Sequence, residues 1–164
     1  MKNKDAFFIQ MARLVSNQSS CCRVKVGAVL VRETRVISIG YNGTPKAQIH
    51  CDDYFTKLYK QKHSKKYKNL EAYKQSDTFY DEHGKWSIKY ELHAEQNAIS
   101  FAAKHGIRTE DADLYITLAP CVSCAKTIIA SGIKRVFYKE PYDRSKDGLI
   151  FLKNNGIKCK QVKG

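Results

Sequence analysis

One histidine, one glutamate and two cysteines are the residues of this sequence best suited to chemistry. His93 and Glu95 lie in the string HAEQNAI, and Cys121 and Cys124 lie in the string PCVSC. One imidazole and two thiolates suit zinc, and three protein ligands leave one tetrahedral position open for a water molecule. A carboxylate two residues after the histidine is placed to move protons to and from that water. The spacing predicts a hydrolytic zinc centre in which Glu95 is the catalytic proton shuttle.

The same residue types also occur in structural zinc sites, or as a buried histidine packed beside two thiols. A CxxC pair by itself favours that structural alternative. Three further features favour catalysis: the His-x-Glu spacing, Pro120 immediately before Cys121, and the predicted helix–strand–helix context.

Predicted secondary structure positions these residues. The periodicity predicts a helix over 92–105 that ends at Gly106, a strand over 114–118, and a helix over 121–131 that ends at Gly132. His93 and Glu95 then lie in the first turn of one helix. Cys121 and Cys124 begin the next helix, where their three-residue spacing directs both sulfurs the same way. The unsatisfied N–H groups of that first turn favour thiolates.

The other elements complete a mixed α/β pattern. An amphipathic helix opens the chain, two β-branched runs form a hairpin, and a last helix ending at Gly156 lies between two strands. In chain order these elements cover 5–15, 25–31, 35–39, 135–138, 148–155 and 157–162. They predict a mixed sheet with helices on its faces, in a single domain over 1–164.

Residues 48–90 differ from the rest, because lysines alternate with tyrosines and helical periodicity is weak. Their apolar content is too low for an independent core. We interpret this stretch as a partly helical insertion that something other than hydrophobic burial holds together. Its lysines form either a solvated face or a patch for a triphosphate or nucleic acid.

Bulk composition narrows the class of protein. The net charge of +13 predicts an anionic partner: nucleic acid, nucleotide phosphates or an acidic surface. No signal peptide and no run of membrane-spanning length is visible, which predicts a cytoplasmic protein without a membrane partner. Metal ligation explains the six cysteines better than disulfides do.

The motifs resemble a known superfamily. HAE…PCVSC matches the cytidine/deoxycytidylate deaminases, and KVGAVLV, GYNGTP, CDDYF, LYITLAPCVSCAK, SGIKRVFY and EPYD extend the match outside the Lys/Tyr-rich stretch. The chain is most similar to deoxycytidylate (dCMP) deaminases of the phage type. The resemblance implies a three-layer cytidine-deaminase-like α/β fold with a five-stranded mixed sheet flanked by helices. It also implies hydrolysis of dCMP to dUMP and ammonia by a zinc-activated water, which supplies dUMP for thymidylate synthesis.

The resemblance further implies a second, structural zinc site. Phage-type enzymes carry a closed site whose ligands match Cys21, Cys51, His83 and Glu91 of this sequence. Such a shell leaves no position for water. A polar insertion without a hydrophobic core needs another source of stability, and a bound structural metal supplies folding free energy directly. By spacing alone, Cys22 is an equal candidate and the four residues could be scattered over the surface. Cys22 and Cys159 are otherwise expected to be small buried apolar side chains.

Substrate contacts are predicted at six positions: Asn42, Tyr142, Val24, Lys25, Ala94 and Thr117. Asn42 offers both a donor and an acceptor, and in the family this asparagine reaches the deoxyribose. The alternative is that Asn-Gly is simply a turn. Tyr142, in EPYD, matches a substrate-binding tyrosine of the phage enzymes, and the alternative there is an ordinary packed aromatic.

The cation for the substrate phosphate is left open between Arg23 and Lys25. Cellular members of the family carry an arginine closer to Val26, where this chain has Val24 and Lys25.

Regulation and assembly follow from the resemblance alone. dCMP deaminases are typically homohexamers that dCTP activates and dTTP inhibits, and magnesium can accompany the allosteric nucleotide. The matching residues here are Gly40, Tyr41, Gly43, Phe101 and Lys104. By spacing alone, Phe101 is expected in the core and Lys104 in solvent.

Two other functions compete with a dCMP deaminase. One is a deaminase of polynucleotides or free nucleosides. The other is a catalytically silent zinc module that binds nucleic acid through its basic insertion. GYNGTP and EPYD favour a mononucleotide, so we do not expect nucleic acid as a partner.

Overall fold

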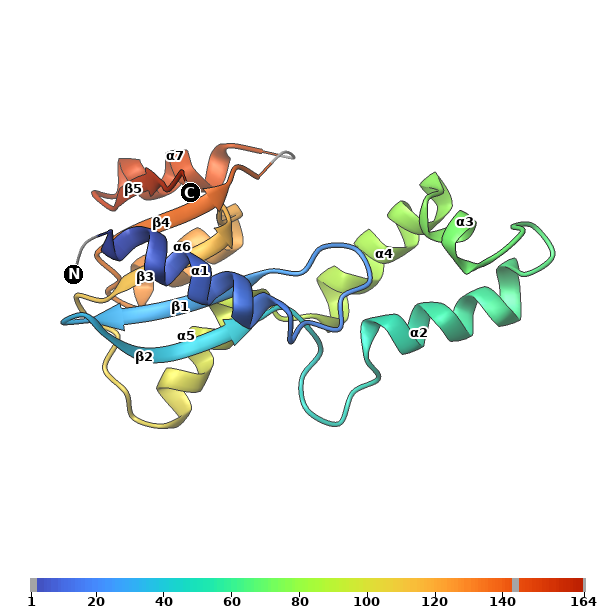
Figure 1. Cartoon of the computed structure of the whole chain (residues 1–164), viewed down its shortest axis with the longest axis horizontal. Helices are drawn as coiled ribbons and strands as arrows, with labels where there is room; N and C mark the ends of the chain where they lie inside the picture. The colour runs from blue at the N-terminus through green and yellow to red at the C-terminus, as the bar shows by residue number, and fades with distance from the viewer. Residues whose placement is uncertain (1–2, 143–144, 164) are drawn as a thin grey trace. The chain divides into compact units, whose positions relative to one another are not determined.

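The computed structural model describes residues 3–142 and 145–163 and forms two compact units (Figure 1). The first unit comprises Met1–Ser19, Val26–Asn42 and His93–Gly164. The second comprises Ser20–Lys25 and Gly43–Leu92, and so contains the whole Lys/Tyr-rich stretch. The interpretation of that stretch as an insertion in a single domain stays a prediction.

The first unit contains a five-stranded mixed sheet in the order β2-β1-β3-β4-β5. β1 pairs antiparallel with β2 and β3, whereas β3–β4 and β4–β5 are parallel pairs. The strands are β1 (Gly27–Arg32), β2 (Arg35–Tyr41), β3 (Asp113–Leu118), β4 (Arg135–Glu140) and β5 (Lys158–Gln161). The predicted five-stranded mixed sheet is confirmed.

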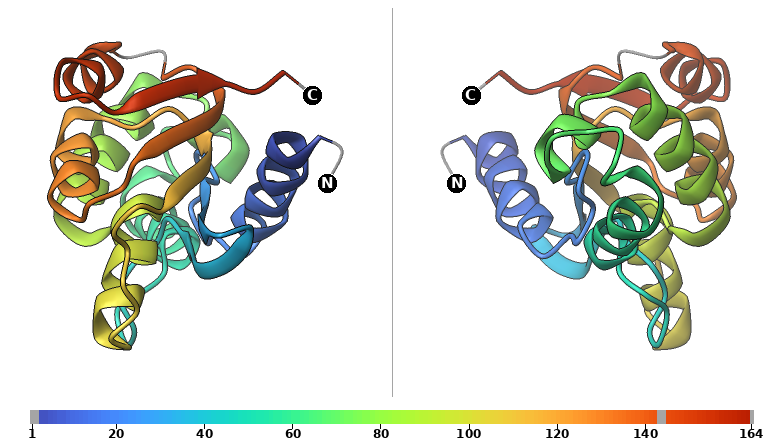
Figure 2. Two further views of the ribbon diagram at one scale, coloured as in Figure 1. Left: turned by 90° about the vertical axis from the view of Figure 1, so that its left-hand side faces the viewer. Right: turned by 90° about the vertical axis from the view of Figure 1, so that its right-hand side faces the viewer.

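Helices cover both faces of this sheet, as Figure 2 shows with α1 (Lys4–Ser16) on one side and α6 (Val122–Ala130) on the other. The period of two along β1 explains the layers. Val29 and Val31 pack with α1, whereas Ala28 and Leu30 pack with α5 (Ala94–Lys104), α6 and α7 (Asp147–Asn154). β1 is therefore apolar on both faces.

The helix ends predicted from glycines are confirmed. Gly106, Gly132 and Gly156 follow α5, α6 and α7 and adopt φ angles of 64°, 73° and 79°. Residues that carry a side chain rarely adopt this left-handed backbone conformation, which glycine reaches at little cost in free energy.

Two glycines without such φ angles allow close packing around the zinc motifs. A Cβ at Gly40, on β2, would collide with the backbone of Ala94 and Ala98 on α5. A Cβ at Gly148, on α7, would collide with the backbone at Pro120 and Cys121. These contacts fix the starts of α5 and α6, where the predicted zinc ligands lie.

The second unit is mostly helical, with α2 (Cys51–Leu58), the π-helix η1 (Tyr59–His63), α3 (Leu70–Lys74) and α4 (Asp77–Tyr90). Its centre is an aromatic cluster that includes Phe55, Tyr73, Phe79 and Trp86, all buried. The expectation that this stretch lacks a core of its own is therefore wrong. A few large rings bury the area that many aliphatic side chains supply elsewhere.

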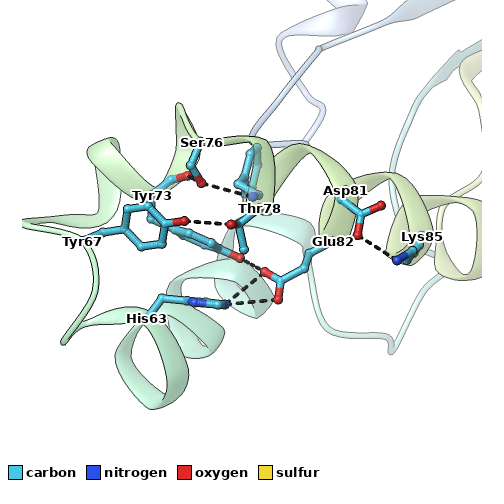
Figure 3. A network of polar contacts seen from close by, with 9 residues as sticks. His63, Tyr67, Tyr73, Ser76, Thr78, Asp81, Glu82 and Lys85 are labelled. Carbon is cyan, nitrogen blue, oxygen red and sulfur yellow. Dashed lines mark hydrogen bonds and ion pairs between the residues drawn. The ribbon is translucent and has the colours of Figure 1, made fainter.

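Polar contacts at the edge of this cluster join η1 to α4 (Figure 3). His63 Nε2 lies 3.1 and 3.2 Å from the carboxylate oxygens of Glu82, and the Tyr73 hydroxyl donates to the same carboxylate at 2.5 Å. The Tyr67 hydroxyl donates to Thr78 Oγ1 at 2.8 Å. The segment that carries most of the lysines is thus tied to the core of its unit.

Within residues 3–142 and 145–163, none of the helices combines the length and the apolar character needed to cross a bilayer.

Candidate active site and second metal cluster

The first unit brings three donor atoms together at the starts of two helices. His93 is the N-cap of α5, and its backbone N–H donates to the Gln96 side chain at 3.0 Å. Cys121 is the N-cap of α6, and Cys124 lies in the first turn of that helix. His93 Nδ1 lies 3.6 Å from the Cys121 sulfur and 3.2 Å from the Cys124 sulfur.

This spacing fits a zinc ion. At ordinary Zn–S and Zn–N bond lengths, tetrahedral donors lie roughly 3.5 Å apart. The three donor atoms here all lie within 4.8 Å of one another. One imidazole and two sulfurs fill three of four tetrahedral positions and leave the fourth for a water molecule or substrate.

The two sulfurs are paired through one proton. A hydrogen bond from Cys124, followed by one with His93, lowers the pKa of the Cys121 thiol to about 4. The same sulfur–sulfur bond, together with burial, raises the pKa of Cys124. One sulfur is therefore already a thiolate at neutral pH. A cation among the donors would replace the shared proton and ionise the second sulfur.

Glu95 lies beside this cluster and outside its donor set. It occupies the first turn of α5, is buried, and forms a side-chain hydrogen bond with Cys124. Burial raises the pKa of the Glu95 carboxyl to about 7. A carboxyl with a pKa near neutrality both accepts and donates protons readily, as a general acid and base must.

The second unit contains a separate cluster of four donors: Cys21, Cys51, His83 and Glu91. The ligand atoms lie within 4.8 Å of one another, and His83 Nε2 is 3.4 Å from each of the two sulfurs. Both cysteines and His83 are buried. These residues fit a tetrahedral zinc ion with every position filled by protein, which is the shell of a structural site.

The geometry separates Cys21 from Cys22. Cys21 belongs to the compact set of four donors, whereas Cys22 lies outside that set with its sulfur 3.5 Å from the Cys51 sulfur. Cys22 and Cys159 are both half-buried and border apolar clusters, which is less complete burial than expected. We therefore assign Cys21 to the proposed donor set.

Comparisons with known proteins identify the family. Residues 2–140 match the family model for the cytidine and deoxycytidylate deaminase zinc-binding region. The chain belongs to this deaminase family. It is 43% identical over 173 residues to the deoxycytidylate deaminase of Enterobacteria phage T2, covering 97% of this chain and 92% of that protein. For the Enterobacteria phage T4 enzyme the identity is 41% over 173 residues, covering 97% and 90%.

A solved structure agrees. The deaminase chain superposes on the dCMP deaminase from cyanophage S-TIM5 in complex with dCMP and dUMP with a TM-score of 0.74. The two are 26% identical, and the match covers 99% of this chain and 98% of the other. The resemblance to phage dCMP deaminases and the cytidine-deaminase-like fold are confirmed.

Four of the six predicted substrate residues of this deaminase lie in the first unit: Asn42, Ala94, Thr117 and Tyr142. Asn42 is buried after β2, where its Oδ1 accepts a hydrogen bond from the Val26 N–H at 2.7 Å. Thr117 Oγ1, on β3, accepts from the Gly27 N–H at 3.1 Å. Ala94 is fully buried, so its side chain packs in the core. These hydrogen bonds give Asn42 and Thr117 a structural role whether or not they touch substrate.

Tyr142 is half-buried after β4. Val24 and Lys25 are exposed residues of the second unit, and Arg23 stacks over the Tyr80 ring at 4.9 Å from its centroid.

The residues matched to regulation are divided between the units. Gly40 and Tyr41 lie on β2, whereas Gly43 belongs to the second unit and pairs with Leu92. Phe101 is 49% exposed on α5, so its expected place in the core is wrong, while Lys104 is exposed as expected. The Phe101 ring lies on the outward face of α5 against His105, at a centroid distance of 4.3 Å.

The sequence interpretation missed two sets of contacts. One is the network of Tyr73, His63 and Glu82 in the second unit, although the frequent tyrosines were a visible signal. The other is the bond from the Asn97 side chain to the Tyr41 carbonyl at 2.8 Å, which ties α5 to β2 beside the site.

Proposed function

We propose that this chain is a zinc-dependent hydrolase that converts dCMP and water to dUMP and ammonia, with Glu95 as the catalytic acid and base. The observation that carries the proposal is the buried Glu95 carboxyl beside three zinc-type donors with a fourth position open. The phage relatives named deoxycytidylate deaminase support dCMP as the substrate.

In this proposal His93, Cys121 and Cys124 hold zinc, which when bound supplies a Lewis acid that lowers the pKa of a water molecule toward 7. Glu95 accepts the proton from that water as its oxygen adds to C4 of the pyrimidine. The carboxyl gives that proton to N3, takes the second proton from the hydroxyl now on C4, and delivers it to the amino group as the C4–N bond breaks and the C4 carbonyl forms. The proton balance closes, because one water is consumed and one ammonia leaves.

Burial of Glu95 supports both halves of this cycle. A carboxyl of ordinary pKa would hold a proton poorly at neutral pH and would be a weak acid catalyst. With its pKa raised to about 7, Glu95 populates both forms where the enzyme works.

The first unit also offers candidate contacts for the nucleotide. Asn42 and Thr117 supply polar atoms at the ends of β2 and β3, and we assign the deoxyribose to Asn42. Tyr142 and the Ala94 backbone complete the proposed contacts of this unit, while Val24 and Lys25 of the second unit are proposed on the resemblance alone. The solved complex of the cyanophage enzyme with dCMP and dUMP supports a mononucleotide substrate.

The remaining parts of the proposal rest on similarity to the phage enzymes. They are supply of dUMP for thymidylate synthesis, activation by dCTP and inhibition by dTTP, magnesium with the allosteric nucleotide, a homohexamer and a cytoplasmic location. The outward Phe101 ring supports a contact role for that residue.

Turnover assays on dCMP, deoxycytidine and single-stranded DNA test the substrate directly. We expect release of ammonia from dCMP, much slower release from deoxycytidine, and none from DNA. Titration of dCTP and dTTP in separate assays then tests regulation.

Deamination of DNA with no activity on dCMP would replace this proposal with a polynucleotide deaminase. A zinc-loaded protein inactive on all three substrates would favour the silent zinc module instead.

A further inference from the structure

A short segment of the second unit carries a dense array of positive charge. Residues 57–68, here called the lysine segment, contain six lysines, and no acidic residue occurs between positions 54 and 70. The lysines are Lys57, Lys60, Lys62, Lys65, Lys66 and Lys68, and all six are exposed. Six like charges over twelve residues repel one another, so the folded unit holds them together at a cost.

Three carboxylates of the second unit that follow the lysine segment in the sequence are engaged by other partners. Glu71 pairs with Lys74 at 3.6 Å, Asp81 with Lys85 at 2.7 Å, and Glu82 with His63 at 3.1 Å. Over the described parts of the chain, none of the six lysines lies within ion-pair distance of a carboxylate.

The lysine segment is a structured platform. The Tyr59 hydroxyl donates to the Tyr67 carbonyl at 3.2 Å, and the Ser64 hydroxyl donates to the Lys60 carbonyl at 3.2 Å. The His63–Glu82 pair and the Tyr67–Thr78 bond fasten the segment to α4 (Figure 3). The ammonium groups therefore stand on fixed backbone, which lowers the entropy lost when they contact a partner.

The segment exposes charge without apolar anchors. None of the large hydrophobic side chains that are exposed in the described chain falls between residues 57 and 68. The tyrosine rings pack inward, as with Tyr59 and Tyr67 against Tyr73 at 6.0 and 5.6 Å between centroids. Protein interfaces draw their affinity from buried aromatic and apolar anchors, so an acidic protein partner would find none here.

We propose that the lysine segment binds the phosphate backbone of nucleic acid, independently of base sequence and separately from deamination. Lysines contact phosphates as compact point charges, and their binding energy comes mainly from release of condensed counterions. The half-buried Tyr59 and Tyr67 rings pack against Tyr73, and Lys66 lies over the Tyr67 ring. We therefore expect charge rather than stacking of unpaired bases to dominate binding. This departs from the expectation, based on sequence alone, that nucleic acid is not a partner, because none of the six lysines has a carboxylate within ion-pair distance over the described parts of the chain.

The test measures fluorescence anisotropy of a labelled single strand and a labelled duplex titrated with the zinc-loaded full chain. Salt is varied between about 50 and 200 mM, and the affinity is expected to fall with a log–log slope of about −4 to −5 on the duplex.

The test variant combines Lys60→Glu, Lys62→Glu, Lys65→Glu and Lys66→Glu. Its matched control combines Lys126→Glu, Lys134→Glu, Lys153→Glu and Lys158→Glu, four exposed lysines of the first unit. Both sets lower the net charge from +13 to +5. We expect the test set to weaken binding at least about 30-fold at low salt and flatten the slope by about 3. The control set should change binding less than about fivefold.

Turnover of dCMP and zinc content show that the variants fold, and four Lys→Gln changes replace the test set if its melting temperature falls. Equal losses in the two sets would overturn the proposal, since net charge alone would then explain binding. It is also overturned if the wild type does not bind DNA, if polyglutamate binds as tightly, or if a labelled nucleoside triphosphate binds better than the duplex.

Discussion

The two clusters of candidate zinc ligands in this protein share the same residue types but differ in where their glutamate lies. In the first unit an imidazole and two sulfurs leave a position open, and Glu95 lies beside them as a buried carboxyl. In the second unit an imidazole and two sulfurs are joined by Glu91, whose carboxylate is itself one of the donors. In the function that we propose, the position of one glutamate therefore separates a centre that activates water from one that only holds the chain together.

The cysteines of the two clusters have similar pKa shifts. A bond from Cys51 lowers the pKa of Cys21 to about 4, as a bond from Cys124 lowers that of Cys121 to about 4. Each cluster therefore contains a thiolate beside a thiol, a pair that favours binding of a cation. Sulfur chemistry does not distinguish a reactive site from a structural one. The two kinds of site are distinguished by the open coordination position and by the carboxyl that lies outside the shell of ligands.

The same Glu→Gln substitution, made separately in each cluster, is expected to give the largest difference between the two clusters. Glu95→Gln is expected to lower kcat for dCMP by about 10²–10⁴-fold with zinc content unchanged, because the amide cannot shuttle protons. Glu91→Gln, the matched control, should keep measurable turnover and instead reduce zinc content and the melting temperature. Turnover and elemental analysis of both variants check this, and an active Glu95→Gln enzyme would contradict the assigned role.

The neighbouring cysteines sharpen the account of the closed cluster. Cys21→Ser is expected to reduce bound zinc from two ions per chain to one and lower the free energy of unfolding by at least about 3 kcal/mol, because it removes a metal ligand. Cys22→Ser removes only a sulfur beside the shell and should cost about 1 kcal/mol or less with both ions kept.

Urea denaturation and zinc analysis measure both effects. The reverse pattern, with zinc lost only in Cys22→Ser, would transfer the ligand role to Cys22.

The smallest expected effect concerns the hydrogen bonds that stabilise the second unit in addition to metal binding. Tyr73→Phe removes the hydroxyl that donates to Glu82 at 2.5 Å, and should lower the free energy of unfolding by about 1–2 kcal/mol. Tyr59→Phe, the control, removes a bond of 3.2 Å to a carbonyl and should cost less, about 0.5–1 kcal/mol. Both variants should keep full zinc content, and zinc loss from Tyr73→Phe would show that the network supports the metal cluster.

Much of the fold followed from local pattern. The periods of two and 3.6 residues, together with the glycines at 106, 132 and 156, located the strands and helices of the first unit to within a few residues. They did not reveal the core of the second unit, because its rings come from separate helices, each of which contributes at most three buried residues. Tyr73 and Phe79 are both buried, yet the sequence around them is mostly polar.

The candidate active site could be predicted because its chemistry is local. His-x-Glu and Cys-x-x-Cys each lie in one helical turn, so residue type and spacing by themselves determined the three donors and the adjacent carboxyl. Only the tertiary structure grouped Cys21 rather than Cys22 with three other donors and placed Phe101 outside the core. It also showed that, over the described residues, the six lysines of the lysine segment have no carboxylate within ion-pair distance. The physical reason is distance along the chain. Local spacing fixes direction within one helix, whereas contacts between remote segments depend on how the whole chain packs.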